Sequence, residues 1–349
     1  MPTFLRRTVP PVGARIPRAA RASQASHGTT ATIVASWLRL ETNPRERRCL
    51  LRYEGQIYRP PCEAHSLIIQ ATVGCPWNRC TFCGMYKDRR FRARPLDDVL
   101  ADLETAREAY PHVPSLFLAD GNTIALPTDH LLSILDRATS LFPELDHIGM
   151  YGGARYLAPG AEPGLGEPKS PAELESLRAA GLSVIYLGLE SGDDETLRRV
   201  KKGVTAQEMI AAGRALDNAG FPVSLYVLIG LGGHERSQEH ARATAAVINA
   251  IEPEIVRPRT LYIQEDTPLW HQRRRGDFVE VGPREALLEV RTLVEQIAVP
   301  VTLLSDHISN YLPLHGRLPA DRDALLAAID RTLAHDDLSG LRPDHFDHL

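Results

Sequence analysis

The sequence has no hydrophobic run long enough to cross a membrane. Its longest nearly uncharged apolar stretch lies around residues 223–233, well short of the roughly 20 residues that a spanning helix needs. It also lacks a strong charge of either sign, because the formal net charge is only −4. We therefore expect no membrane partner and no nucleic-acid partner.

Cysteines are few and odd in number. The five are Cys49, Cys62, Cys75, Cys80 and Cys83, with three of them packed into nine residues. This pattern does not suit a disulfide framework and instead favours reduced thiols that serve as metal ligands. Reduced thiols in turn favour a cytoplasmic location.

The first forty residues contain no Asp or Glu but six arginines. Such a segment buries too little apolar surface to order itself, so we expect a disordered tail over residues 1–40. Its composition also resembles that of an organelle transit peptide, which leaves targeting open. Residues 41–65 are expected to lead into the folded domain.

From residue 66 onward, short uncharged apolar runs alternate with helical patterns. The runs cover residues 66–71, 115–119, 147–151, 183–189, 222–229, 255–261 and 301–304. Helix starts are marked by capping boxes at Ser170 and Thr205. The alternation predicts an α/β fold with a parallel sheet, either doubly wound or a full or partial barrel. In both architectures ligands bind beyond the carboxyl ends of the strands.

The loop after the first predicted strand carries Cys75, Cys80 and Cys83 in C-x4-C-x2-C spacing. Iron–sulfur clusters are held by cysteine thiolates, and three ligands leave one iron of a [4Fe-4S] cluster open for chemistry. One alternative is a structural zinc site completed by Cys62 or His65, since structural zinc prefers four ligands. A second alternative is three unrelated buried cysteines.

The segment Cys80-Thr-Phe-Cys83-Gly-Met-Tyr resembles the radical S-adenosylmethionine (SAM) superfamily, although the commonest family spacing has one residue fewer between the first two cysteines. The chain is similar to a stand-alone group often labelled by analogy with coproporphyrinogen oxidase. The resemblance implies a (β/α)6-type partial TIM barrel over residues 66–269, with residues 270–349 completing or capping it. It also implies that Cys75, Cys80 and Cys83 hold a [4Fe-4S] cluster, with Phe82 near the adenine of SAM.

The same resemblance assigns SAM-binding roles to three later strand ends. Asp120, Gly121 and Asn122 would face the amino group of SAM, with a simple turn as the alternative. Glu190 or Ser191 would contact its ribose or carboxylate, unless Ser191 or Asp193 only caps a helix. Gly230 would lie in the turn on the adenine side.

The implied reaction is reductive cleavage of SAM to a 5′-deoxyadenosyl radical, which abstracts hydrogen from an unidentified substrate. Only Cys49 and Cys62 remain beyond the triad, so a single cluster is expected, with oxidation, rearrangement or radical addition as outcomes. A one-electron donor such as a flavodoxin or ferredoxin would be the partner. The rival interpretations are a zinc-stabilised binding protein and a protein that carries electrons or clusters.

Substrate-binding residues are predicted only from their position after strands. Arg155 follows the third predicted strand and is a candidate for binding a carboxylate or phosphate. His307 follows the last predicted strand and is a candidate catalytic residue, with helix capping as the alternative. Surface pairing is expected for at least one of Arg257 and Arg259, and His240 is expected on a helix surface.

Overall fold

The computed structural model describes residues 51–158, 165–338 and 341. Residues 48–349 form one compact unit, and residues 1–47 form another that lies outside the described part. The predictions for the N-terminal tail and for Cys49 therefore fall outside the described residues.

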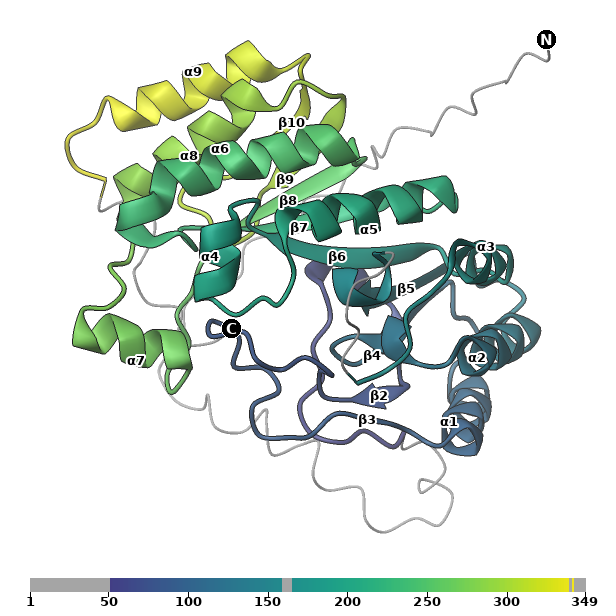
Figure 1. The fold of residues 1–349 in the computed structure, drawn as a ribbon. Coiled ribbons are helices and arrows are strands. Elements are labelled where there is room, and N and C mark those ends of the chain that lie inside the picture. Colours follow the sequence, from purple (N-terminus) through teal and green to yellow (C-terminus); the bar gives the residue numbers. More distant parts are fainter. Residues whose placement is uncertain (1–50, 159–164, 339–340, 342–349) are drawn as a thin grey trace, which may run out of the picture. The chain divides into compact units, whose positions relative to one another are not determined.

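The described unit is built on one eight-stranded sheet (Figure 1). The strand order is β1-β4-β5-β6-β7-β8-β9-β10. All neighbouring pairs are parallel except β9 and β10, which are antiparallel. The strands are β1 (Leu67–Gln70), β4 (Ser115–Ala119), β5 (His147–Gly152), β6 (Val184–Glu190), β7 (Val223–Ile229), β8 (Ile255–Thr260), β9 (Val301–Ser305) and β10 (Leu314–Leu318). Every predicted apolar run contains a strand, whereas β10 was not predicted.

Helices connect the parallel strands, as the alternating sequence pattern predicts, and a last helix follows β10. They are α1 (Leu96–Ala109), α2 (Thr128–Leu141), α3 (Pro171–Ala179), α4 (Asp194–Arg199), α5 (Ala206–Asn218), α6 (Gly233–Ile251), α7 (Pro268–Arg275), α8 (Pro283–Gln296) and α9 (Arg322–Leu333). The capping boxes at Ser170 and Thr205 form as predicted and start α3 and α5. No helix in the described ranges is long and apolar enough to cross a membrane.

The two faces of the sheet have different neighbours. On the outer face, strand side chains such as Leu118 and Leu225 share a core with helix residues such as Leu103 of α1 and Leu216 of α5. On the inner face, Phe117 packs with Tyr186 in a separate cluster that contains no residue of an α-helix. A doubly wound sheet would carry helices on both faces. The fold is therefore the partial barrel.

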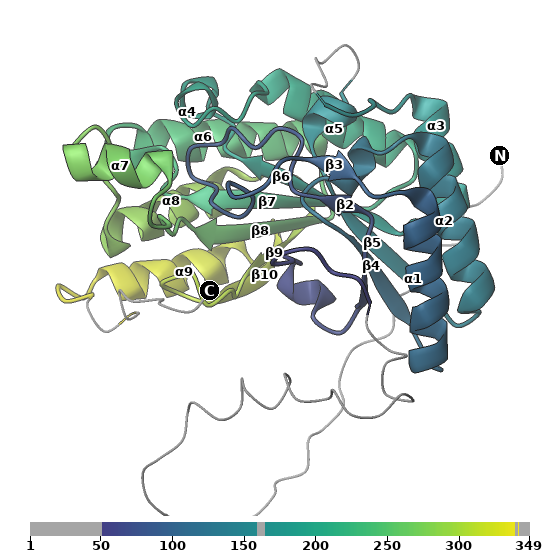
Figure 2. The same cartoon turned by 90° about the horizontal axis from the view of Figure 1, so that it is seen from below.

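The inner face is lined by aromatic rings and covered by the lead-in segment. Tyr186 lies 6.3 Å from Tyr151 and 6.2 Å from Tyr226, measured between ring centroids. The short helix η3 (Pro61–Glu63) places the buried carboxyl of Glu63 against this face, where it accepts hydrogen bonds from Tyr186 at 2.5 Å and pairs with His147 at 2.7 Å. Figure 2 shows this purple segment beside β9 and β10.

The C-terminal segment continues the sheet. The predicted boundary at residue 269 falls inside α7, and β9 pairs directly with β8 in parallel. The amide of Asn310 ties these two strands together, because it bonds to the end of each. Its Oδ1 accepts from the N–H of Thr260 on β8 at 2.8 Å, and its Nδ2 donates to the hydroxyl of Ser305 on β9 at 3.0 Å.

Candidate active site

The three clustered cysteines lie on a loop that leaves the carboxyl end of β1. A small two-stranded sheet closes the base of this loop, with β2 (Thr72–Val73) antiparallel to β3 (Arg92–Ala93). Within the loop, the Nδ2 of Asn78 donates to the carbonyl of Tyr86 at 2.5 Å. The sequence prediction of a loop at this strand end is confirmed, whereas the hairpin at its base was not predicted.

Contacts with the turn after α4 hold the cysteine loop in place. The indole N–H of Trp77 donates to the carbonyl of Lys201 at 2.8 Å, and the N–H of Thr81 donates to Val200 at 2.9 Å. Arg155 stacks its guanidinium 3.8 Å from the ring centroid of Trp77 and donates to the carbonyl of Gly203 at 2.6 Å. Arg155 thus helps to position the loop, and its role as a substrate anchor stays a prediction.

The three cysteines are free thiols. Burial raises the pKa of Cys80 to about 12, and the neighbouring thiols Cys83 and Cys75 raise it further, while the ammonium of Lys202 opposes the rise. The free thiol of Cys80 is therefore protonated at neutral pH. Binding to iron must displace this proton, since the thiolate is the metal ligand.

The chemistry of this donor set is that of an iron–sulfur site. Cys75, Cys80 and Cys83 are free thiols on one loop, and cysteine thiolates are the usual ligands of iron–sulfur clusters. The residues present therefore fit a [4Fe-4S] cluster in the kind of ligand that they offer.

Lys202 is a site residue that the sequence did not indicate. Its ammonium donates to Glu190 at 2.9 Å, and only 18% and 14% of the two side chains are exposed. Burial opposes the charge of Lys202, but the carboxylate of Glu190 favours it, and the pKa of Lys202 is raised. Glu190 itself has a left-handed φ of 61° at the end of β6. A fixed positive charge therefore lies beside the cysteines.

The segment at the end of β4, which was predicted to face the amino group of SAM, is buried under the cysteine loop. One carboxylate oxygen of Asp120, Oδ2, accepts from the N–H of Gly74 at 3.2 Å, while Oδ1 has no hydrogen-bond partner among the described residues. Burial raises the pKa of Asp120. Asn122 accepts from the N–H of Gly153 at 2.9 Å. Their predicted roles in binding SAM stay predictions.

Gly121 is required by close packing. A Cβ atom at this position would lie 2.5 Å from the ring of Tyr86, so the ring can pack on the backbone only because no side chain is present. Burial raises the pKa of the Tyr86 hydroxyl well above its usual range, and Asp120 raises it further. The loop and the end of β4 therefore form one packed unit.

At the end of β6, Glu190 and Ser191 point to different sides. Ser191 is fully buried and its hydroxyl pairs with Nδ1 of His240 in α6 at 2.7 Å. Of the two predicted contacts to SAM, only Glu190 therefore lies on the side of the cysteines. His240 is also fully buried, so its expected surface position is wrong.

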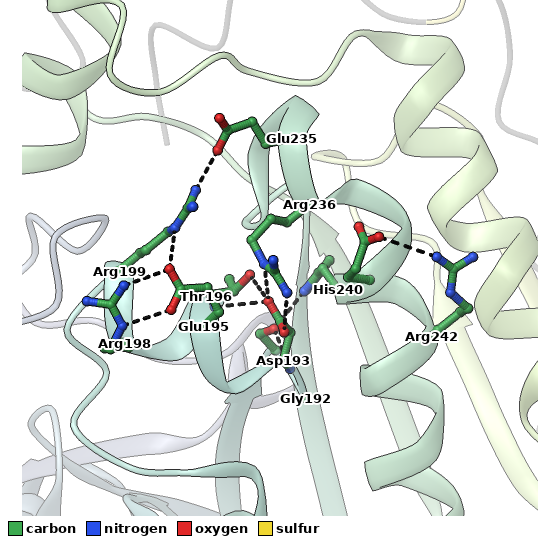
Figure 3. A network of polar contacts seen from close by, with 12 residues as sticks. Gly192, Asp193, Glu195, Thr196, Arg198, Arg199, Glu235, Arg236, His240 and Arg242 are labelled. Atoms are coloured by element: carbon green, nitrogen blue, oxygen red, sulfur yellow. Dashed lines mark hydrogen bonds and ion pairs between the residues drawn. The ribbon is translucent and has the colours of Figure 1, made fainter.

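Asp193, and not Ser191, caps α4. Its Oδ2 accepts from the N–H of Thr196 at 3.0 Å. Both carboxylate oxygens also accept from Arg236 of α6 at 2.8 Å, as Figure 3 shows. Beyond them, Arg199 bridges Glu195 and Glu235 at the surface. The network ties the segment after β6 to α6.

Phe82, which was predicted to lie near the adenine of SAM, packs close to the turn after β7. It contacts an apolar cluster that contains Leu231, from the turn after β7, together with Val200 and Leu261. Gly230, at the start of that turn, has a φ of 87° and donates its N–H to Glu289 of α8 at 2.7 Å. The structure thus brings Phe82 and the turn of Gly230 to the same side of the cysteine loop.

His307 lies beyond β9, away from these residues. Its Nδ1 accepts from the N–H of Ser309 at 3.0 Å, and the residue lines a cavity with Asp306. Asn310, three residues further along, forms the hydrogen bonds to β8 and β9 described above. The catalytic role of His307 stays a prediction.

Comparison with known proteins gives one family match and several partial relatives. A family model described as the Radical SAM superfamily matches residues 69–245. The 4′-phospho-dehydrooxetanocin synthase of Priestia megaterium is 29% identical over 169 residues, which are 44% of this chain and 22% of that protein. The tRNA uridine(34) acetyltransferase of Methanocaldococcus infernus is 24% identical over 151 residues, 40% of this chain and 28% of that one. The chain thus spans less than a third of either relative.

Two solved structures are similar to the chain at low sequence identity. Coproporphyrinogen III oxidase from Escherichia coli, described as a radical SAM enzyme, superposes with a TM-score of 0.48 at 17% identity, over 67% of this chain and 52% of that one. Methylornithine synthase gives a TM-score of 0.46 at 16% identity, over 76% and 68%.

Proposed function

The chain belongs to the radical SAM superfamily, and from this premise we propose that it is an enzyme that uses one [4Fe-4S] cluster and SAM. Cys75, Cys80 and Cys83 would hold the cluster. When bound, the cluster supplies one electron to the sulfonium of SAM, which yields methionine and a 5′-deoxyadenosyl radical that takes hydrogen from the substrate. Loss of this hydrogen would lead the substrate to oxidation, rearrangement or radical addition.

The observation that carries the proposal is the set of three free thiols on the loop after β1, with the ammonium of Lys202 beside them. A positive charge stabilises thiolates, and it also attracts a carboxylate such as that of SAM. Glu190 fixes the position of Lys202 by its 2.9 Å contact. The pair therefore serves both the ligands and the cofactor.

The remaining predicted residues would bind and orient SAM. Phe82 and the apolar cluster around Leu231 offer a water-poor surface for the adenine. Oδ1 of Asp120 is a buried acceptor without a partner in the described part of the chain, so it suits an ammonium group. A one-electron donor of the flavodoxin or ferredoxin class would reduce the cluster, and a reducing compartment such as the cytoplasm would keep the thiols free.

Anaerobic reconstitution with iron and sulfide tests this proposal. We expect a broad visible absorbance that bleaches with dithionite, together with 5′-deoxyadenosine formed from SAM. Stoichiometric zinc without a cluster would refute the proposal in favour of a zinc-stabilised protein. A cluster that never cleaves SAM, even with a strong reductant, would favour an electron or cluster carrier.

Two matched cysteine variants test the ligand assignment. Cys80→Ala should abolish cluster binding, measured as iron per chain and visible absorbance. Cys62→Ala should leave both unchanged, because Cys62 lies on the lead-in segment beside Tyr186 and not on the cysteine loop. Equal loss of iron in both variants would show that the assignment is wrong.

A further inference from the structure

A cavity of about 290 Å³ opens on the inner face of the sheet. Its walls come from the lead-in segment, from β8, from β9 and from the residues that follow β9, and none belongs to the cysteine loop. The lining residues are Pro61, Cys62, Arg257, Pro258, Arg259, Leu304, Asp306, His307 and Ile308. Two of them are arginines, which is unusual for an interior wall and calls for a ligand or an ion-pair partner.

Strand alternation directs both arginines to the inner face. Val256 packs in the outer core with the helices, so Arg257 and Arg259, one and three residues further along β8, point the other way. Arg257 is in register with Tyr226 of the neighbouring strand. The guanidinium of Arg259 lies 4.9 Å from the ring centroid of Tyr226.

Neither arginine forms an ion pair within the described ranges, so the predicted surface pairing is wrong. Arg257 donates a long hydrogen bond of 3.4 Å to the hydroxyl of Ser224, and Arg259 contacts the ring of Tyr226. The carboxyl of Glu63 is held by His147 and Tyr186. Asp306 lines the cavity and offsets at most one of the two positive charges. The wall therefore carries excess positive charge with unused donors.

The same face continues to the proposed SAM site. Leu228 follows Tyr226 by two residues on β7, and Leu261 follows Arg259 by two residues after β8. Both leucines belong to the cluster against which Phe82 packs. A ligand held by the arginines would therefore extend along this face towards Phe82.

We propose that this cavity binds the carboxylate or phosphate group of the substrate, so that the substrate is an organic anion. Guanidinium groups bind both anions in a planar, bidentate manner. The identification of the bound anion as the substrate rests on the proposed function. The anion site itself depends only on Arg257 and Arg259. Tyr226 would form the flat wall beside the bound group.

Cys62 lines the same cavity and has an exposed thiol, so its alkylation reports the local charge. In the cluster-reconstituted full chain under anaerobic conditions, we would measure its rates with anionic iodoacetate and neutral iodoacetamide by peptide mass spectrometry. Arg257→Gln/Arg259→Gln should lower the iodoacetate-to-iodoacetamide ratio by about threefold or more, because two nearby positive charges are lost. Arg242→Gln, at an exposed position on α6, should leave the ratio unchanged.

Protection of Cys62 from alkylation in the unmodified chain provides a second test, which needs no variant. Inorganic phosphate or succinate, at matched ionic strength, should slow the alkylation of Cys62 by iodoacetamide. Stronger protection by phosphate indicates a phosphorylated substrate, and stronger protection by succinate a carboxylic acid. An unchanged ratio in the double variant, or no protection by either anion, overturns the proposal.

SAM cleavage measured in the same samples separates the two proposals. If 5′-deoxyadenosine forms but the alkylation ratio does not respond to the arginines, the anion site is refuted and the enzyme stands. If the ratio responds but SAM is not cleaved, the anion site stands and the proposed function fails.

Discussion

Glu289 offers a test of how the ends of β6 and β7 are held. It is fully buried in α8 and accepts the N–H of Gly230, while its Oε1 has no hydrogen-bond partner among the described residues. Burial raises the pKa of Glu289 to about 7. Nε2 of His240 lies 3.7 Å away, and burial lowers the pKa of His240 to about 4. At pH 6 the folded protein therefore holds a protonated Glu289 beside a neutral His240.

The direction of the pH effect follows from these shifts. Between pH 4.5 and about 7 the folded chain keeps a proton on Glu289 that the unfolded chain loses. The contribution of Glu289 to stability is therefore complete below pH 4.5 and is lost as the pH rises through about 7. Since one pKa unit is worth 1.36 kcal/mol, the total loss is roughly 3 kcal/mol.

His240 acts in the opposite direction. Its pKa is lowered from 6.5 to about 4, so its contribution is complete above pH 6.5 and is lost as the pH falls through about 4. In the unmodified chain the two effects nearly cancel between pH 4.5 and 6.5. Comparison with a variant that lacks only the carboxyl group is needed to isolate Glu289.

Urea unfolding of the reduced, metal-free chain, followed by circular dichroism at pH 5, 6, 7 and 8, provides that comparison. Glu289→Gln resembles the protonated carboxyl, so its unfolding free energy should rise relative to the unmodified chain by about 2 to 3 kcal/mol between pH 5 and 8. Glu295→Gln, at an exposed position on the same helix, serves as the control and should show no such trend. A difference that stays constant or falls with pH would mean that Glu289 is ionised in the fold, and the reasoning would be wrong.

Three further substitutions test the packing of the site. Lys202→Met should destabilise the fold by about 2 to 3 kcal/mol, because it leaves the largely buried Glu190 unpaired. The double variant Lys202→Met/Glu190→Gln should recover at least half of this loss in urea unfolding, and no recovery would refute the pairing. Gly192→Ala should cost about 3 kcal/mol, because its Cβ would lie 2.3 Å from a backbone carbonyl oxygen of α6. Gly282→Ala, where nothing lies within 4 Å of the added Cβ, should cost less than about 1 kcal/mol by thermal unfolding. Asp193→Ala should cost about 2 kcal/mol and lower the thermal midpoint, because α4 loses its cap and Asp193 loses its bidentate contact with α6; an unchanged midpoint would contradict this.

The sequence determined the parts of the fold that depend on neighbouring residues. Uncharged apolar runs can only be buried strands in such an alternating chain, and Ser170 and Thr205 cap their helices by contacts within four residues. The clustering of Cys75, Cys80 and Cys83 within nine residues predicted that they share one loop for the same reason. Each of these signals lies within one short segment, so it is visible without the fold.

The tertiary structure decided every role that depends on contacts between distant segments. Lys202, from the turn after α4, interacts electrostatically with Cys80, and Arg155, which follows β5, stacks on Trp77 of the cysteine loop. His240 is buried against Ser191, and Arg257 lines an interior cavity, because helix packing and strand alternation set the direction of each side chain. No local pattern encodes which partner a charged side chain meets across the sheet. The sequence therefore determined where the chemistry is located, and only the fold determined which side chains surround it.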